Sequence, residues 1–335
     1  MRLFVAALCS MLLPATATAA TATSDARTDI VNLRHGRLGS TQQFLGWTAD
    51  GEAVSRRLVC SEGGTTSCRA SINTLKLGAA ERSTVLFEIE ELYETATARD
   101  PKGPISTREA SAFIRGERAA IDALGELTPS PAAADPAGVF GEIGGEPTQV
   151  YLRTSSRRTD EEALNLYISV RGPRGASVDL EHMVQAPWRV DSEQVLDARI
   201  SPDGTTVWLA MHYTDGVMCW DGEDIELTIA DRGRVRAQLA NAAGLRADRA
   251  GELHEAATRF QQATREDPSY AWGWFNQGAL SSRAGDVDAA AASLREAIAL
   301  DPSLAARACD DEDYTALAAS AEGDALMACG YEEGC

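Results

Sequence analysis

The chain has 335 residues and a formal net charge of −19 at pH 7, with 44% hydrophobic and 24% charged residues. This length suffices for two or three domains with cores of their own, and the balance of residues excludes wholesale disorder. The negative charge disfavours the basic face with which proteins bind nucleic acid, so we expect no nucleic-acid partner.

The first residues, 1–20, have the order of a secretory signal peptide. Arg2 gives a cationic start, an apolar run follows over 3–13, and Pro14 precedes small residues that offer cleavage sites. The run is too short to span a bilayer, which takes about 20 apolar residues; the alternative is a short buried first helix. No later segment is apolar and long enough to span a membrane. We therefore predict an exported protein, periplasmic or secreted by a bacterium.

Cleavage of such a signal removes Cys9 and leaves an even number of cysteines, which in an exported chain favours disulfide bonds. Cys60 and Cys68 flank a hairpin-like loop and are the expected local pair. The cysteines near the end of the chain are expected to supply a second pair, which leaves Cys219 bridged to the tail or free. No cysteine has zinc-site spacing, so we expect no metal. The disulfide candidates are Cys60, Cys68, Cys219, Cys309, Cys329 and Cys335.

Residues 24–126 are predicted to form a β-hairpin-rich subdomain. Two strand-like runs, 44–47 and 53–60, lie on either side of an Asp-Gly turn. A weaker strand covers 72–77. The pattern over 83–94 fits either a strand or a helix.

An amphipathic helix is predicted over 106–124. Ser106 and Glu109 form a capping box, and one apolar stripe follows until Gly125. The next segment, 127–147, is rich in Pro, Ala and Gly. This composition predicts a linker or a long loop.

Residues 148–231 are predicted to form a β-sandwich-like domain or a compact barrel. Apolar and polar residues alternate over 164–170, 207–213 and 225–229, which gives each strand one apolar face. Asp-Gly turns separate several of these runs. His182 shares the apolar face of its run, so a core histidine is favoured over a catalytic one.

From residue 233 the chain is Ala-rich and helical, and it repeats after 34 residues. Small residues such as Gly278 and Ala290 would let two antiparallel helices approach closely, and Asp301-Pro302 would end one helix and start the next. The recurring pairs are Gly244 and Gly278, Gly251 and Gly285, Ala256 and Ala290, Phe260 and Leu294, Ala263 and Ala297, Asp267 and Asp301, and Pro268 and Pro302.

The second copy, with its run Trp274-Phe-Asn-Gln-Gly278, resembles the tetratricopeptide repeat family, which has the same period. The first copy departs from the family at Ala240 and Ala247, where the family has a large aromatic residue and a tyrosine. The resemblance implies one repeat at 237–268 and a second at 271–302.

Because a repeat cannot bury its outer face alone, we expect the tail of region 233–335 to form a C-terminal capping helix within 310–328. The family also implies a concave groove, lined by the first helix of each pair, that would hold a protein or peptide partner. Trp272 and Phe275 are the expected anchors. The alternative is that they bury against the tail. The implied groove residues are Gln238, Asn241, Leu245, Asp248, Arg249, Trp272, Phe275, Ala279, Ser282 and Arg283.

No recognisable catalytic motif occurs in the sequence. His254 starts a pattern like the H-E-x-x-H of zinc proteases, but Thr258 stands where the second histidine is needed. The acidic clusters 221–224 and 310–313 could hold calcium through oxygen ligands, yet neither has EF-hand spacing. A solvated turn and a helix start explain them. We therefore expect no cofactor and no catalytic residue.

These patterns predict an α+β multidomain protein. A β-rich N-terminal region, sandwich- or barrel-like with one amphipathic helix, precedes an α-helical tetratricopeptide-repeat domain. The favoured function is that of a non-enzymatic exported adaptor with a protein partner in the repeat groove. Two alternatives are an exported, hydrolase-like enzyme with a site in the β-rich region and a calcium- or carbohydrate-binding β-module.

Overall fold

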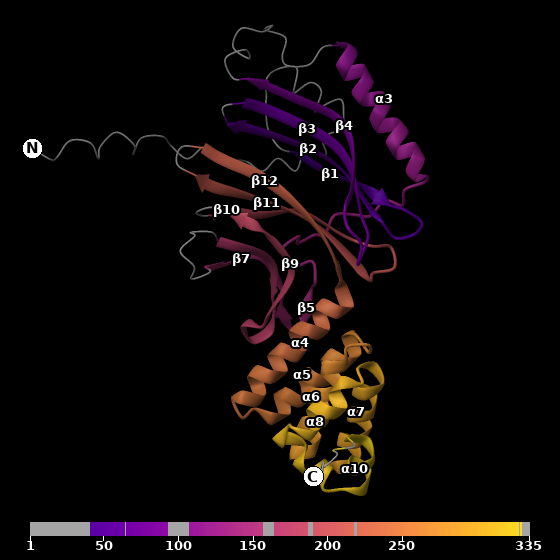
Figure 1. The fold of residues 1–335 in the computed structure, drawn as a ribbon, viewed down its shortest axis with the longest axis vertical. Coiled ribbons are helices and arrows are strands. Elements are labelled where there is room, and N and C mark those ends of the chain that lie inside the picture. Colours follow the sequence, from indigo (N-terminus) through magenta and orange to yellow (C-terminus); the bar gives the residue numbers. More distant parts are fainter. Residues whose placement is uncertain are drawn as a thin grey trace, which may run out of the picture.

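The protein has a β-rich N-terminal region followed by a helical C-terminal part, and the two lie at opposite ends of an elongated molecule (Figure 1). Among the residues described below, no helix has the length and apolarity to cross a membrane. The predicted signal peptide, Cys219 and Cys335 lie outside the described residues. The computed structural model describes residues 41–63, 65–92, 107–156, 164–186, 190–217, 220–327 and 329.

The first sheet is an antiparallel meander in the order β1-β2-β3-β4. The run 83–94, for which a strand and a helix were both possible, lies largely in β4, which pairs with β3 along nearly its whole length. An amphipathic helix, α3, follows this sheet. The elements are β1 (Thr41–Trp47), β2 (Ala53–Gly63), β3 (Thr65–Leu75), β4 (Arg82–Leu92) and α3 (Thr107–Leu124).

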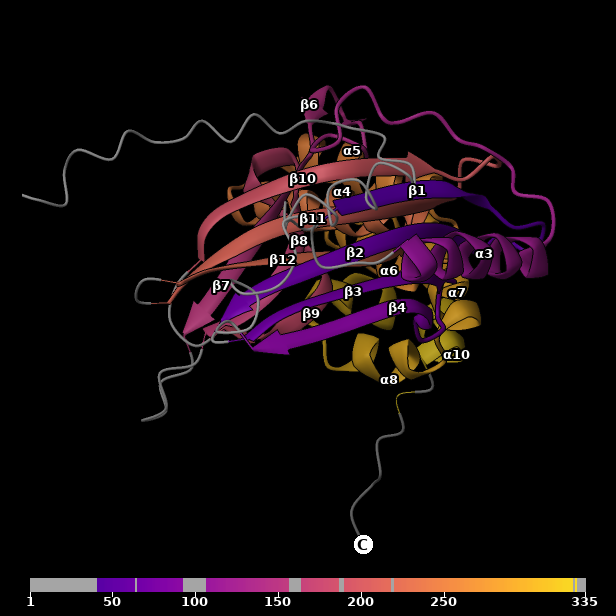
Figure 2. The ribbon, with the colours of Figure 1, turned by 90° about the horizontal axis from the view of Figure 1, so that it is seen from above.

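Helix α3 covers one face of the first sheet, beside β3 and β4 (Figure 2). Phe113 packs against Leu58 and Ala70, and all three are buried. Arg56 of β2 is also buried on this side and forms an ion pair with Glu117 of α3 at 3.2 Å. The apolar stripe and the ion pair of Arg56 with Glu117 therefore hold the helix on the sheet.

Two further antiparallel sheets have the orders β7-β8-β9 and β10-β11-β12, and a two-stranded ribbon, β5-β6, precedes them. The elements are β5 (Glu142–Ile143), β6 (Glu146–Pro147), β7 (Gln149–Ser156), β8 (Leu164–Arg171), the short helix η1 (Pro173–Gly175), β9 (Ser177–Ala186), β10 (Val190–Ile200), β11 (Thr206–Val217) and β12 (Trp220–Asp231).

The three main sheets stack through the two faces of β11, since successive side chains of a strand point to opposite sides. Trp208 faces the first sheet, where it packs with Phe44 and Trp47; the rings of Phe44 and Trp208 are 5.0 Å apart. Leu209 faces the other way and packs with Leu166 of β8. Figure 1 shows the resulting order, with the β10–β12 sheet between the other two.

The segment 127–147 contributes buried side chains to the core, so of its two alternatives the linker is wrong and a long loop fixed to the sheets describes it. Thr128 and Trp47 exchange two backbone hydrogen bonds of 2.8 Å, which tie the segment to β1. Further on, Phe140 and Ile143 are fully buried in the main core. Between these anchors, Ala132 and Ala133 pair with β10, and Ala137 and Gly138 form a turn. Because Pro, Ala and Gly dominate the composition of 127–147, the composition gives no sign of the few buried apolar side chains that fix the segment.

The helical part begins directly where β12 ends. Asp231 caps the first helix by accepting a hydrogen bond from the backbone nitrogen of Arg234 at 2.8 Å. Helices α4 and α5 form one pair and α6 and α7 a second, and short elements follow. The elements are α4 (Arg232–Arg249), α5 (Leu253–Glu266), α6 (Ala271–Arg283), α7 (Val287–Leu300), α8 (Ser303–Cys309), η2 (Glu312–Tyr314), α9 (Thr315–Ala318) and α10 (Ala321–Met327).

The tail after α8 forms three short elements, which replaces the single capping helix expected within 310–328. Asp311 accepts a hydrogen bond from the backbone nitrogen of Asp313 at 3.0 Å and starts η2. Ser320 accepts one from the backbone nitrogen of Gly323 at 3.0 Å and starts α10. Because these polar side chains cap new turns, they interrupt the helix that the apolar residues alone would favour.

Close helix packing at Gly244 yields a testable difference between two helical glycines. A Cβ on Gly244 would lie 2.6 Å from the ring of buried Phe260, whereas a Cβ on Gly116 of α3 would meet no atom closer than 3.9 Å. We expect Gly244→Ala to lower the free energy of unfolding by about 1–2 kcal/mol through overpacking.

The matched control, Gly116→Ala, is expected to raise the free energy of unfolding by about 0.5–1 kcal/mol, because alanine loses less backbone entropy in a helix. Urea unfolding followed by circular dichroism measures both variants. A similar rise for both would contradict the close approach at Gly244.

Candidate functional site

The predicted groove residues of α6 lie beneath the C-terminal tail. Phe275, Ala279 and Ser282 are buried and form a surface that we call the α6 groove face. The ring of Tyr314 lies 5.1 Å from that of Phe275, and its hydroxyl donates a hydrogen bond to the Phe275 carbonyl oxygen at 2.6 Å. Burial raises the pKa of Tyr314 well above its usual range, so the hydroxyl stays a donor.

Leu317 makes the second contact of the tail with the α6 groove face. Its backbone nitrogen donates a hydrogen bond to Ser282 Oγ at 3.2 Å, and its side chain is fully buried in the same apolar cluster as Phe275. Tyr314 and Leu317 are three residues apart and therefore share one side of a helical turn. The residues between them are exposed. This turn of the tail thus presents Tyr314 and Leu317 inward as anchors.

Arg283 joins three elements at one end of the α6 groove face. Its guanidinium forms ion pairs with Asp248 of α4 and with Asp313 of η2, the latter at 3.2 Å. Hydrogen bonding to Asp248 raises the pKa of Arg283 from its ordinary value. These ion pairs are partly exposed to solvent, so each contributes only about 0.2–1 kcal/mol to stability.

Trp272 lies at the other end of this face and is only partly buried. Its ring meets that of Phe275 edge-on, with centroids 5.5 Å apart. The guanidinium of Arg307, an exposed residue of α8, lies 4.8 Å from the Trp272 ring centroid, a cation–π contact. Trp272 and Arg307 therefore form a partly exposed pair beside the covered face.

The groove positions on α4 are in a more polar setting. Asn241 is buried and accepts a hydrogen bond from Asn276 Nδ2 of α6 at 2.7 Å. Tyr270 also hydrogen-bonds to Asn241, and burial raises the pKa of its hydroxyl. The other α4 positions differ in exposure: Gln238 and Leu245 are partly buried, and Arg249 is exposed.

The structure therefore brings six of the predicted groove positions together with one another or with the tail: Asp248, Trp272, Phe275, Ala279, Ser282 and Arg283. Sequence reasoning missed the specific partners that Tyr314 and Asp313 find on α6. The available signal was their chemistry, since an acidic and an aromatic side chain complement Arg283 and Phe275, which lie on the same face of α6.

A disulfide between Cys309 and Cys329 closes the tail. Its Cα atoms are 5.7 Å apart, and the two cysteines are separated by 20 residues in sequence. A loop of this length stabilises the folded state by about 3 kcal/mol in the chain-entropy model. Cys68 is disulfide-bonded as well, and the backbone of Cys60 stands opposite it in the β2–β3 ladder.

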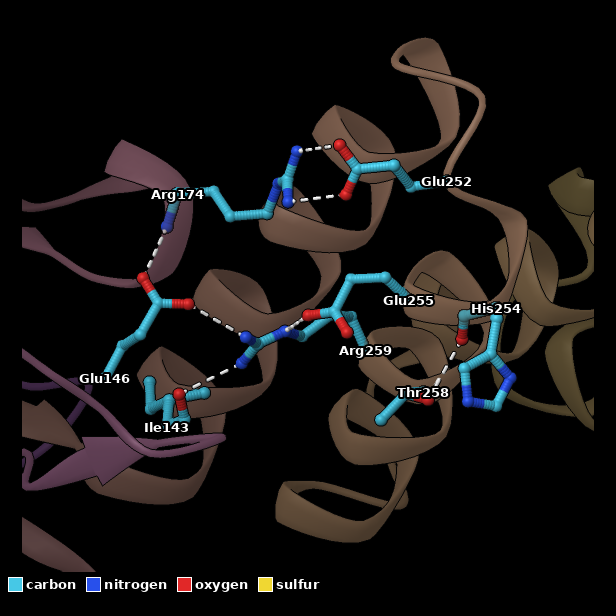
Figure 3. Close-up of polar contacts among 8 residues, drawn as sticks. All are labelled: Ile143, Glu146, Arg174, Glu252, His254, Glu255, Thr258 and Arg259. Atoms are coloured by element: carbon cyan, nitrogen blue, oxygen red, sulfur yellow. Dashed lines mark hydrogen bonds and ion pairs between the residues drawn. The ribbon is translucent and has the colours of Figure 1, made fainter.

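Arg259 of α5 attaches the helical part to the β-rich region (Figure 3). Its side chain is only 7% exposed, and it forms ion pairs with Glu146 at 2.9 Å and with Glu255 at 2.7 Å. It also donates a hydrogen bond to the carbonyl oxygen of Ile143 at 3.0 Å. A buried guanidinium with all these partners fixes α5 against the β5–β6 ribbon.

We call the contact of α5 with the β5–β6 ribbon around Arg259 the junction. Arg174 extends the junction on the side of the β-rich region. Its backbone nitrogen donates a hydrogen bond to Glu146 at 3.0 Å, and its guanidinium binds Glu252 through two hydrogen bonds of 2.8 and 3.0 Å. Nearby, Arg236 of α4 forms an ion pair with Glu266 at 2.6 Å. The junction is therefore charged and highly hydrogen-bonded.

His254, the first residue of the protease-like pattern, is not part of this network. Figure 3 shows its imidazole directed away from Arg259, and the Thr258 hydroxyl donates a hydrogen bond to the His254 carbonyl oxygen at 2.9 Å, as threonine side chains do within helices. Of the cluster 310–313, Asp311 caps η2 and Asp313 pairs with Arg283. Over the described part of the chain, no group of three or more His, Cys, Asp or Glu residues could hold a metal.

Comparison with known proteins finds no matching family model, no similar curated protein and no similar solved structure. The function of this chain must therefore be inferred from the contacts described above.

The junction is tested by Arg259→Ala. The variant removes the donor to the buried Ile143 carbonyl and the partner of two glutamates, so we expect the free energy of unfolding to fall by about 1–3 kcal/mol. Arg265→Ala changes an exposed arginine of the same helix and is expected to stay within about 0.5 kcal/mol of the wild type. Urea unfolding compares them. Equal stabilities would contradict a structural role for Arg259.

Proposed function

We propose that this protein is an exported, non-enzymatic interaction protein whose helical part binds a protein or peptide partner. The observation that carries the proposal is the partly exposed pair of Trp272 and Arg307. It lies beside a face that already holds a segment of polypeptide, residues 311–317. Tryptophan and arginine are among the side chains that most often dominate binding energy at interfaces.

The resemblance of 237–268 and 271–302 to tetratricopeptide repeats supports the same function, because that family presents the first helix of each pair to its partners. We interpret the β-rich region as a sandwich-like support that fixes the helices through Arg259. Export is supported by the disulfide between Cys309 and Cys329, since such bonds persist in oxidising compartments.

The chemistry of the pair also limits the partner. A segment that places an apolar side chain over the Trp272 ring and a carboxylate near Arg307 satisfies both groups. The overall negative charge of the chain disfavours a polyanion, so we propose a protein segment with isolated acidic residues.

Peptide selection on the oxidised, full-length protein tests the proposed function. A displayed random-peptide library is expected to yield binders whose affinity falls about tenfold or more in Trp272→Ala, the loss typical of an interface anchor. Leu253→Ala is the control, because it removes an exposed leucine of α5 outside the groove positions. Circular dichroism verifies that both variants fold.

Two results would overturn the proposal. One is a library that yields no enriched peptide. The other is a set of binders that Trp272→Ala and the wild type hold equally well.

A further inference from the structure

Residues 311–317 have the geometry of a bound peptide. Tyr314 and Leu317 point inward and are fully buried, while Glu312, Thr315 and Ala316 are exposed. Anchors three residues apart on one short helical turn are the pattern with which amphipathic peptides enter grooves. The segment therefore contacts the helices through a small, defined set of side chains.

Each contact of this segment is one that a separate peptide could make. The Tyr314 hydroxyl bonds to a main-chain carbonyl oxygen of α6, and the Leu317 backbone nitrogen bonds to Ser282 Oγ. Asp313 offers its carboxylate to Arg283. These groups of α6 select an acidic residue, an adjacent aromatic ring and a leucine three positions further on.

The segment itself has little intrinsic tendency to stay in place. Its elements η2 and α9, and α10 that follows, have three, four and seven residues, and isolated helices this short do not persist in water. The disulfide between Cys309 and Cys329 encloses all of them. Closing such a loop disfavours release of the tail by about a hundredfold, from the loop-closure entropy.

We infer that the α6 groove face is a binding site for a short acidic peptide with an aromatic residue and a leucine three residues later. Residues 311–317 are its resident occupant, and the disulfide between Cys309 and Cys329 keeps it there. This inference rests on the proposed function and extends it, because it names a second, covered part of the groove and the chemistry of the peptide that fits it.

Release requires a dithiol reductant. One thiolate of the dithiol attacks a sulfur of the Cys309–Cys329 bond, and its second thiolate then resolves the mixed disulfide. The S–S bond of the protein breaks, an S–S bond forms in the reductant, and the two protons of the dithiol end on the two cysteine sulfurs. Two electrons pass from the dithiol to the protein.

A fluorescein-labelled synthetic peptide with the sequence of residues 310–318 probes the site by fluorescence anisotropy. The oxidised wild type is expected to bind it about a hundredfold more weakly than the double variant Cys309→Ser, Cys329→Ser, in which the disulfide cannot form. The wild type treated with dithiothreitol is expected to match the double variant. Full-length protein is used throughout.

A second variant covers the case in which loss of the disulfide unfolds the tail region. Tyr314→Ala with Leu317→Ala keeps the disulfide but removes both resident anchors, so it is expected to bind the labelled peptide without reductant. Adding Phe275→Ala is expected to lower that affinity about tenfold or more, whereas adding Leu300→Ala, an exposed residue of α7, leaves it unchanged.

The inference is overturned if the peptide binds neither the double-serine variant nor the anchor variant, or if oxidised and unlocked proteins bind it equally. Such a failure is separable from failure of the proposed function. Library peptides whose binding depends on Trp272 in the oxidised protein would still support the proposed function. In that case only peptide binding at the covered α6 groove face would be ruled out.

Discussion

Two helix pairs cannot bury both ends of their own array, and this constraint determines how the rest of the molecule is arranged. At one end, the β-rich region covers α4 and α5. Leu239 packs directly against the backbone at Gly172, and Arg259 is enclosed by Glu146 and the Ile143 carbonyl. At the other end, the tail turns back and covers α6 with Tyr314. Each part of the chain thus completes the core of another.

The two covered ends differ in physical character, and the difference matters for function. The junction at Arg259 depends on a buried guanidinium, whose separation from its partners would leave polar groups unsatisfied, so it is suited to permanent attachment. The tail end depends on apolar packing by Tyr314, Leu317 and Met327, on the hydrogen bond from the Tyr314 hydroxyl to the Phe275 carbonyl oxygen, and on one covalent bond between Cys309 and Cys329. Breaking that single bond makes release of the tail from α6 more favourable, and it leaves the contacts of Arg259 at the junction in place.

Local patterns in the sequence predicted local structure well. The alternation around Trp208 and Leu209 predicted a strand with two distinct faces, and both faces are buried because β11 lies in the middle sheet. The composition of 127–147 favoured a linker, but a few buried apolar side chains such as Phe140 fix the segment in the core despite its many Pro, Ala and Gly residues. Burial of a segment depends on those side chains rather than on average composition.

Specific partners distant in sequence were not predicted. The family resemblance selected Phe275 and Ser282 as groove residues, and burial of Phe275 against the tail was the stated alternative. The resemblance could not identify Tyr314 as the residue that covers Phe275, because the two lie 39 positions apart. The ion pair of Arg259 with Glu146 spans 113 positions, and neither residue stands out locally. Such pairs are fixed only once the sheets and helices have packed, so one sequence carries no local signal for them.

Native-state amide hydrogen exchange at Leu317 tests the central claim most directly, because this amide donates to Ser282 Oγ only while the tail covers α6. The account predicts a protected Leu317 amide in the oxidised protein. After reduction by a dithiol, this protection falls by about a hundredfold while the amides of α4 and α5 keep theirs. A Leu317 amide that exchanges rapidly in the oxidised protein, or one that stays equally protected after reduction, would contradict it.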